Sequence, residues 1–321
     1  MFSLARPITA LLLLALPALV SAQGFPKGPV KLIVPFPPGG GSDVVARAIA
    51  PKMAEVLGQP VIIENRAGAS GNIGTELVAK APADGQTLLM ASAATAIQTT
   101  LAKNLAWDLA RDFAPVSLLV INQSVLVAHP SVRAASVKEL LAFAKVNPGK
   151  LSFASYGNGT SAHLAGELFK LLGGVDLLHV PYKGAAPATS DVLGGQVDLL
   201  FADVAAVLPH LKAGRLKALG IGSSKRFEGL PEVPTIAEAG LAGYEGGGWL
   251  GLVVPAATPR EAIAALNAAV SKSLASPEVR ERLVALATIP VGNTPAYFGD
   301  FLHGEVAKWA RVIRVAHVTG D

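Results

Sequence analysis

The chain carries one local plan twice: an apolar strand, a glycine-rich elbow and an amphipathic helix. The first copy occupies residues 31–57 with its elbow at 37–43, and the second occupies 150–172 with its elbow at 157–161. At the start of such a helix the backbone N–H groups lack partners within the helix, so they attract anions. The repeat therefore predicts two similar α/β lobes, and two elbows that face each other would bind an anion between them.

Strands and helices alternate after each elbow. In the first half, apolar runs at 61–64 and 87–91 flank a helical pattern at 72–80. In the second half the same order ends in a strand at 197–201. Alternation of this kind is typical of parallel sheets covered by helices, so the fold class is α/β.

The length of the chain favours two lobes, because single hydrophobic cores stop growing at roughly 250–300 residues. We expect lobe I to comprise residues 23–122 and 250–321, and lobe II to comprise 123–249. The hinge crossings are expected near 120–125 and near 244–250, and the second contains three consecutive glycines. Glycine gives the backbone the freedom that a hinge requires.

The N-terminus has the pattern of a secretory signal peptide. Arg6 precedes an apolar run over 8–20, and small residues follow up to Ala22. This pattern predicts a signal peptide at residues 1–22 that is cleaved after Ala22, and hence a periplasmic protein. The sequence contains no cysteine, which excludes disulfides and the lipid-modified cysteine of a lipoprotein.

The charge pattern does not indicate a nucleic-acid-binding protein. The formal net charge is +4, lysines and arginines do not form runs, and aromatic residues make up only 6% of the chain. Proteins that bind nucleic acid usually concentrate basic residues on one face and offer aromatic rings for stacking. We therefore expect no nucleic-acid partner.

Several ordered segments resemble the Bug or TctC family of periplasmic solute-binding proteins, the receptors of tripartite tricarboxylate transporters. The matching segments are 34–43, 64–74, 163–167, 180–184, 194–198 and 230–235. The resemblance implies a two-lobe Venus-flytrap fold, with a mostly parallel sheet in each lobe, that closes over a small organic acid. It further implies membrane subunits of a tripartite carrier as partners, or a signalling receptor if the protein is a carboxylate sensor. We expect a monomer without catalytic activity, cofactor or metal.

Main-chain N–H groups of the two elbows are the expected ligand contacts. About four charge-assisted hydrogen bonds, each contributing about 1.5–3 kcal/mol, reach micromolar affinity after association costs, so no arginine is required. The predicted binding residues are Phe36, Gly40, Gly41, Ser42, Asp43, Ala91, Ser92, Ala93, Tyr156, Asn158, Gly159, Thr160, Ser161, Tyr182 and Asp203. Tyr156 stands where the family often has a small residue, so its phenol is expected to narrow the pocket and to contact the distal part of the ligand.

Some of these residues also have purely structural interpretations. Asp43 is most simply the N-cap of the first helix, and Thr160 or Ser161 the N-cap of the second. Phe36 and Tyr156 could be core aromatics, and Tyr182 could lie in a surface turn. Asn65 is expected to tie a loop rather than to touch ligand.

Two kinds of secreted enzyme are the rival interpretations. The spacing of Gly157, Gly159 and Ala162 between a strand and a helix matches a dinucleotide fingerprint, with Asp176 near the ribose-binding distance. This short match is weak, and it falls in the second unit of the chain rather than the first. A hydrolase is disfavoured because the G-x-S-x-G elbow is missing. His163 and Glu167 lie four residues apart without a second nearby histidine, so a metal site is not expected.

Overall fold

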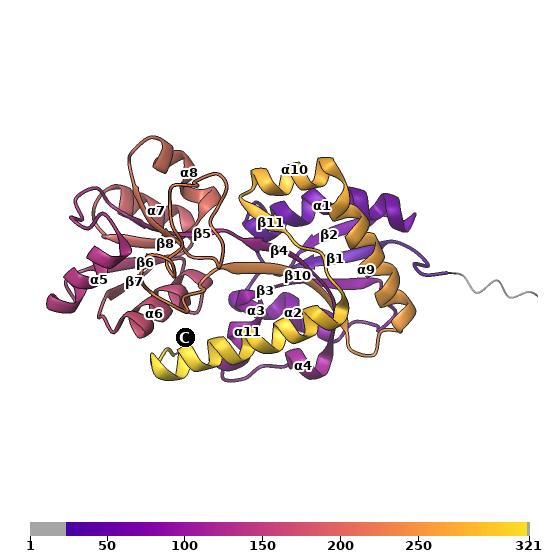
Figure 1. Ribbon diagram of the computed structural model, residues 1–321. Coiled ribbons are helices and arrows are strands. Elements are labelled where there is room, and N and C mark those ends of the chain that lie inside the picture. Colours follow the sequence, from indigo (N-terminus) through magenta and orange to yellow (C-terminus); the bar gives the residue numbers. More distant parts are fainter. Residues whose placement is uncertain (1–23, 320–321) are drawn as a thin grey trace, which may run out of the picture.

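The computed structural model describes residues 24–319, which form two lobes, each built on one sheet with flanking helices (Figure 1). The predicted signal peptide lies outside the described residues. Within residues 24–319, none of the helices combines the length and the apolar character that crossing a membrane requires.

Lobe I is built on a six-stranded sheet with the order β11-β4-β10-β3-β1-β2. Its strands are β1 (Val30–Val34), β2 (Val61–Asn65), β3 (Thr87–Ser92), β4 (Phe113–Asn122), β10 (Gly248–Pro255) and β11 (Thr288–Pro290). The first three strands are parallel, whereas β10, β4 and β11 pair in antiparallel fashion. The expectation of a mostly parallel sheet therefore holds for β1 to β3, and the later strands make the sheet mixed.

Helices cover both faces of the lobe I sheet. They are α1 (Gly41–Leu57), the 3-10 turn η1 (Ala69–Gly71), α2 (Asn72–Ala79), α3 (Ala93–Leu101), α4 (Leu109–Asp112), α9 (Arg260–Ala275) and α10 (Pro277–Ala285). Alternate residues of β1 enter different clusters: Leu32 and Val34 pack with α1 and α9, whereas Ile33 packs with α3. A strand that is buried on both faces reads as a continuous apolar run, which is the pattern found in the sequence.

Lobe II repeats this plan with five strands in the order β7-β6-β8-β5-β9. The strands are β5 (Ser124–Ala128), β6 (Ser152–Ser155), β7 (Leu178–Pro181), β8 (Leu199–Asp203) and β9 (Lys217–Ile221), and the helices are α5 (Val137–Val146), α6 (Ser161–Gly173), α7 (Ala185–Leu193) and α8 (Val204–Lys212). Strands β7, β6 and β8 are parallel, and β5 is antiparallel to both of its neighbours.

Two segments carry the chain from one sheet to the other. Gln123 alone separates β4 from β5, and β10 begins at Gly248, which pairs with Asn122. The Gln123 backbone is held on both sides, since its N–H donates to Ala287 O at 3.1 Å and its carbonyl accepts from Val204 N at 2.9 Å. The two crossings therefore lie side by side.

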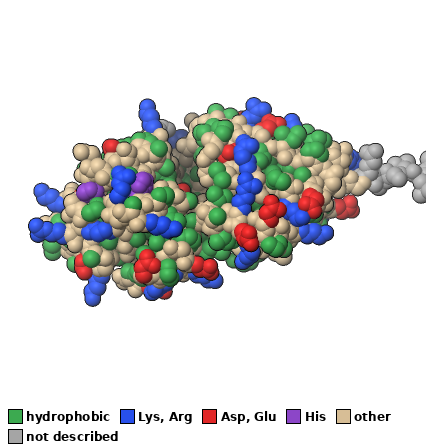
Figure 2. Space-filling model, turned by 90° about the horizontal axis from the view of Figure 1, so that it is seen from above, with side chains coloured by type: hydrophobic (Ala, Val, Ile, Leu, Met, Phe, Trp, Pro, Cys, Tyr) green, Lys and Arg blue, Asp and Glu red, His purple; other side chains and the backbone are tan. Residues whose placement is uncertain are grey.

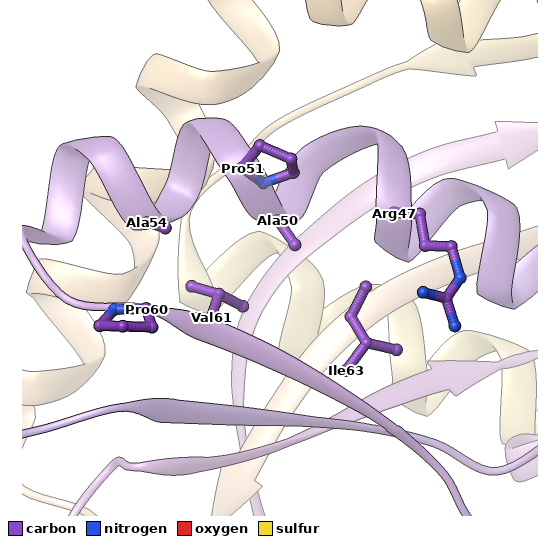
Figure 3. A pocket seen from close by; sticks show the side chains of 7 residues that line it. All are labelled: Arg47, Ala50, Pro51, Ala54, Pro60, Val61 and Ile63. Carbon is purple, nitrogen blue, oxygen red and sulfur yellow. The ribbon is translucent and has the colours of Figure 1, made fainter.

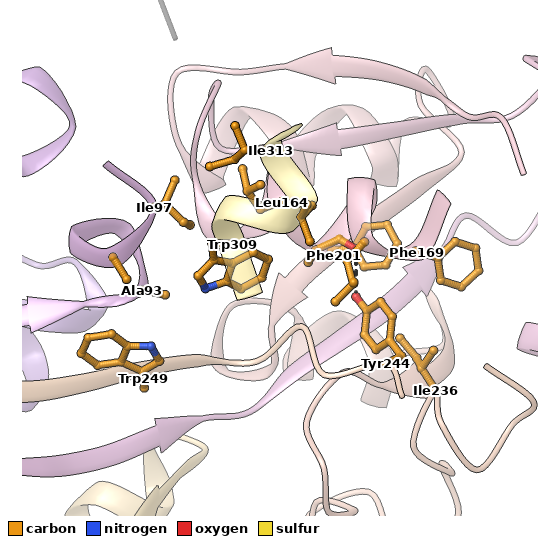
Figure 4. Packing of buried hydrophobic residues seen from close by; sticks show 14 of the residues in the cluster. Ala93, Ile97, Leu164, Phe169, Phe201, Ile236, Tyr244, Trp249, Trp309 and Ile313 are labelled. Atoms are coloured by element: carbon orange, nitrogen blue, oxygen red, sulfur yellow. Dashed lines mark hydrogen bonds between the residues drawn. The ribbon is translucent and has the colours of Figure 1, made fainter. Parts of the chain in front are cut away.

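The last helix, α11 (Pro295–Val315), links the two lobes. It packs on α3 and β4 of lobe I and also contacts α6 of lobe II. Figure 4 shows Trp309 and Ile313 of α11 beside Leu164 of α6. Glu305 Oε2 accepts hydrogen bonds from the indole N–H groups of Trp249 at 2.7 Å and Trp309 at 2.9 Å. This carboxylate joins α11 to β10, the strand that follows the second crossing.

Candidate functional site

The first elbow, between β1 and α1, is held by the Asp43 side chain, which is 2% exposed. Its carboxylate accepts from Gly39 N at 2.9 Å, Arg47 Nε at 2.9 Å and Asn65 Nδ2 at 3.0 Å. These donors, Arg47 foremost, lower the pKa of Asp43 to about 2. Asp43 is therefore ionised, and its carboxylate links parts of the elbow through hydrogen bonds.

The N-cap interpretation of Asp43 is wrong. Helix α1 begins at Gly41 and Gly40 takes the cap position, which places Asp43 in the first turn. A glycine can occupy an N-cap, so the helix extends three residues further than the side-chain pattern indicated. Asn65 ties the loop as expected, because its Nδ2 also donates to Phe36 O at 3.0 Å.

The other predicted residues of lobe I are spread over two neighbouring strand ends. Phe36 is half-buried against Gly71, Gly40 and Gly41 are exposed, and Ser42 is half-buried. Ala91, Ser92 and Ala93 are buried where β3 passes into α3. The Ser92 N–H donates to Thr95 Oγ1 at 3.1 Å, and the Ser92 hydroxyl has no hydrogen-bond partner within residues 24–319.

In the second elbow, between β6 and α6, most polar groups form hydrogen bonds within the elbow. Thr160, one of the two residues expected at this position, is the N-cap of α6: its Oγ1 accepts from His163 N at 3.4 Å and donates to Gly157 O at 2.8 Å. The Gly159 N–H donates to His163 Nδ1 at 3.1 Å, and the Thr160 N–H donates to Gly157 O at 3.3 Å. The backbone N–H groups of Ser161 and Ala162, in the first turn of α6, have no partner within an α-helix.

A small cavity of about 10 Å³ lies beside the crossings, which is room for about one water molecule. Its lining residues are Ser124, Tyr156, Ser161, Ala162, Ala165, Phe201, Ala202, Asp203, Gly246 and Gly248. The structure thus brings together three predicted residues: Tyr156, Ser161 and Asp203. The predicted residues of lobe I, and those of lobe II at 158–160 and at Tyr182, do not line this cavity.

Asp203 and Tyr156 form the polar floor of the cavity. The Asp203 N–H donates to Tyr156 Oη at 3.2 Å, and Ser124 lies opposite Asp203 in the β5–β8 register. Burial raises the pKa of Asp203 to about 6, and burial together with the Asp203 charge raises the pKa of Tyr156. Asp203 therefore remains largely ionised near neutral pH and takes up a proton in mild acid.

Tyr182 lies on the outer side of the second elbow. Its hydroxyl donates to Asp191 Oδ2 at 2.7 Å on α7. Burial and the Asp191 carboxylate together raise the pKa of Tyr182 to about 12. The side chain is thereby fixed to α7.

Sequence reasoning missed the lining residues that come from the crossings. Ser124 starts β5, while Gly246 and Gly248 precede or begin β10, so they are more than a hundred residues apart in sequence. In the sequence, the glycine run at 246–248 indicates only backbone freedom. The antiparallel registers of β4, β5 and β10 are what place these residues together.

A larger, open groove lies on lobe I, away from the crossings. Its volume is about 480 Å³, and Figure 3 shows it between α1 and β2. It is lined by Arg47, Ala50, Pro51, Ala54, Pro60, Val61 and Ile63. None of the predicted binding residues lines it. Among residues 24–319, no cluster of three or more histidine and acidic side chains could hold a metal ion.

Charged side chains do not form a single basic surface on the face drawn in Figure 2. Lysines and arginines are scattered over both lobes, and acidic side chains lie among them on lobe I. A duplex-binding face would require a continuous basic stripe. The face drawn does not carry such a stripe.

Two lobes on separate mixed sheets, joined by two adjacent crossings with a polar cavity beside them, define a two-lobe solute-binding protein. The chain belongs to the tripartite tricarboxylate transporter family receptors, whose profile matches residues 45–318. Proteins of this family are periplasmic solute-binding receptors.

Individual relatives support this assignment. The chain is 44% identical over 292 residues to a UPF0065 protein from the tcbD–tcbE intergenic region of Pseudomonas sp., covering 91% of this chain and 87% of the relative. It is 40% identical over 297 residues to the protein BugT of Bordetella pertussis, covering 92% and 91%. The resemblance drawn from the sequence motifs is therefore confirmed.

Solved structures confirm the predicted two-lobe α/β fold. An R. palustris protein determined with adipate has a TM-score of 0.80 and 36% identity, and the match covers 92% of this chain and 99% of that one. MatC from Rhodopseudomonas palustris with bound malate has a TM-score of 0.78 and 35% identity, with coverage of 90% and 100%.

Proposed function

We propose that this protein captures a small organic acid between its lobes and delivers it to the membrane subunits of a tripartite carrier. The observation that carries the proposal is the cavity at the N-terminus of α6, whose lining includes the hydroxyl-bearing residues Ser124, Tyr156 and Ser161. Hydroxyls and free helix N–H groups are the donors that a carboxylate requires. The adipate and malate bound to the two R. palustris structures support an acid as the ligand.

The free energy available at this site suffices for micromolar binding. Charge-assisted hydrogen bonds contribute about 1.5–3 kcal/mol each, and a helix N-terminus adds roughly 0.3–1 kcal/mol. Ser161 and Ala162 would supply N–H groups from lobe II. We propose that Ser92, with its free hydroxyl beside β10, and Ser42 at the start of α1 bind the acid from lobe I.

Ligand entry requires the lobes to separate, because the cavity has room for about one water molecule. We propose that the lobes pivot at Gln123 and at Gly246–Gly248, where the chain crosses between the sheets. An acid that contacts both lobes then shifts the population toward the closed form. The membrane subunits would recognise that closed form.

The first test is a thermal-shift panel of mono-, di- and tricarboxylates, aromatic acids and amino acids on the purified protein. A ligand at 100 times its dissociation constant adds about 2.7 kcal/mol of stability. We expect one acid class to stabilise the protein and Ser161→Ala to weaken its binding about tenfold, because one charge-assisted hydrogen bond is lost. Ser42→Ala is the matching variant on lobe I, and it tests the hydroxyl that we propose to bind the acid from that lobe. A panel in which no acid raises the melting temperature would contradict the proposal.

Export and delivery need separate measurements. We propose that residues 1–22 direct export, and N-terminal sequencing of the periplasmic protein should then begin at Gln23. For delivery, cells that lack the protein should lose uptake of the stabilising acid and regain it with the wild-type gene. Uptake that continues unchanged without the protein would favour a role as a carboxylate sensor.

A further inference from the structure

A column of three stacked rings lies beneath the second elbow. The His163 ring of α6 lies parallel to the His179 ring of β7, with ring centroids 3.9 Å apart and planes 6° apart. Phe153 of β6 stacks on the other face of His179 at 4.9 Å. His163 is 6% exposed, and Gly166 lets α6 approach closely, because a Cβ there would overlap the Phe153 ring. The column is therefore rigidly packed.

Both histidines are hydrogen-bonded to the elbow. His163 Nδ1 accepts the Gly159 N–H at 3.1 Å, so the ring proton of neutral His163 is on Nε2. His179 Nε2 lies 2.7 Å from Ser155 Oγ, and that oxygen accepts the Gly157 N–H at 3.2 Å. The backbone of both elbow glycines is thus fixed, directly or through Ser155, by the histidine pair.

The position of the elbow matters for both lobes. Ser161, which lines the cavity, follows Gly159 by two residues. A Cβ at Gly159 would overlap Leu101 Cδ2 of α3, so the elbow is already in close contact with lobe I. A shift of the elbow would therefore move the start of α6 and change the contact between the lobes.

We propose that His163, supported by His179, is a positioning residue that holds the second elbow in the conformation that presents the start of α6 to the cavity. The proposal rests on the proposed function only for its effect on acid affinity. The hydrogen bond from Gly159 to His163 can be tested without any ligand.

Acid should release the elbow, since a protonated His163 cannot accept the Gly159 N–H and two stacked imidazolium rings repel each other. Burial, the neighbouring His179 and Lys170 lower the pKa of His163 to about 3, and burial and Lys170 lower that of His179 to about 4. The charged groups that face the pair are Lys170 and Glu167, both on α6, with Glu167 Oε1 3.9 Å from His163 Nε2.

The sign of the pH effect follows from these values. An unfolded histidine has a pKa near 6.5, above both folded values, so the pair contributes its full stability above about pH 6.5. That contribution falls as the pH decreases toward 4 and then 3. Amide exchange of Gly159 should accelerate over the same range, beyond the intrinsic pH dependence of exchange.

Two substitutions separate the acceptor from the stacking ring. His163→Asn keeps an acceptor, because Asn Oδ1 lies near the place of Nδ1, whereas His163→Phe keeps a stacking ring and loses the acceptor. The readout is amide hydrogen exchange of Gly159 by NMR, together with the affinity for the acid that the thermal-shift panel identifies. His303→Asn, at an exposed position on α11, is the control.

We expect His163→Asn to keep Gly159 protection within about threefold of wild type, and His163→Phe to reduce both protection and acid affinity about tenfold. His179→Gln, which retains a polar atom near Nε2, should give an intermediate loss and remains informative if the Phe variant does not fold. Wild-type Gly159 protection and acid affinity in His163→Phe would overturn the proposal. If no acid binds, the exchange result still decides the role of His163, while the proposed function alone fails.

Discussion

In the two elbows, different side chains accept the equivalent backbone N–H group. In each, the third residue of the helix accepts the N–H of a glycine four positions earlier: Asp43 from Gly39, and His163 from Gly159. The first elbow is exposed at its glycines, and its acceptor is an ionised carboxylate paired with Arg47. The second elbow is packed against lobe I, and its acceptor is a neutral imidazole.

The difference follows from the groups that face each acceptor, since both side chains are buried: Asp43 is 2% exposed and His163 is 6% exposed. A carboxylate in the place of His163 would be charged, and its desolvation would cost several kcal/mol unless a cation paired with it. Histidine offers an acceptor without charge above its folded pKa. At the first elbow Arg47 pairs with Asp43, so an aspartate can be used. The same elbow geometry is therefore compatible with either acceptor, and the second elbow is in addition packed against the other lobe.

The largest expected effect tests that contact directly. Both elbow glycines have positive φ, 81° at Gly39 and 69° at Gly159, so alanine costs roughly 1–2 kcal/mol at either site. Only Gly159→Ala also pushes a methyl group into Leu101 of lobe I, which adds about 1–3 kcal/mol unless that side chain rotates away. Urea denaturation should therefore show a loss of about 2–5 kcal/mol for Gly159→Ala and about 1–2 kcal/mol for Gly39→Ala.

Scattering provides a second reading of the same pair. The added methyl group in Gly159→Ala holds the lobes apart, so the radius of gyration of this variant should exceed that of Gly39→Ala. Equal losses in the free energy of unfolding and equal radii of gyration in the two variants would mean that the second elbow does not pack against lobe I.

An intermediate effect concerns the acidic residue of each lobe. Arg47 lowers the pKa of Asp43, whereas Asp203 has its pKa raised to about 6 by burial. An ionised Asp203 repels a bound carboxylate by about 1.6 kcal/mol at 10 Å and an effective dielectric constant near 20. The affinity for a monocarboxylate should therefore rise about tenfold as the pH falls from about 8 to about 5, through the Asp203 pKa.

Calorimetry with Asp203→Asn checks this assignment. The variant should bind with the higher affinity at both pH values, and Asp43→Asn should leave the pH dependence between 8 and 5 unchanged. An affinity that falls in acid would instead indicate that Asp203 pairs with a cationic group of the ligand.

The elbows were predictable because glycine spacing is a local signal. Helix α6 with its Thr160 cap followed from the same local chemistry. The cap of α1 did not, because Gly40 carries no side chain that marks a helix start, and the pattern pointed to Asp43 instead. In the sequence His163 has no second histidine nearby, but its ring partner His179 comes from a separate strand, and only the β6–β7 register places it there.

The cavity was less predictable than the elbows for the same reason. Its residues Tyr156, Ser161 and Asp203 stand at strand and helix ends that local patterns reveal. Ser124 and Gly248 enter only because antiparallel pairing aligns distant segments at the crossings. No local pattern encodes this long-range pairing.

The smallest expected effect distinguishes the contributions of Arg47 and Asn65, the two side chains that bind Asp43 in the first elbow. Arg47 is about half-exposed, and its pairing with Asp43 is weakened by solvent, whereas Asn65 joins Asp43 to Phe36 O from a half-buried position. Asn65→Ala should lower the free energy of unfolding by about 1 kcal/mol at pH 7, because it removes the two hydrogen bonds that Asn65 donates and an exposed one that it accepts from Arg47, and Arg47→Ala should lower it by less. Arg47→Ala should nevertheless raise the Asp43 pKa from about 2 toward its ordinary value. Asp43 contributes its stability above its unfolded pKa near 3.9 and loses it as the pH falls to the folded pKa, so in this variant the acid loss should be smaller and should end at a higher pH. A greater loss at pH 7 for Arg47→Ala than for Asn65→Ala would show that the exposed ion pair, and not the buried amide, fixes the first elbow.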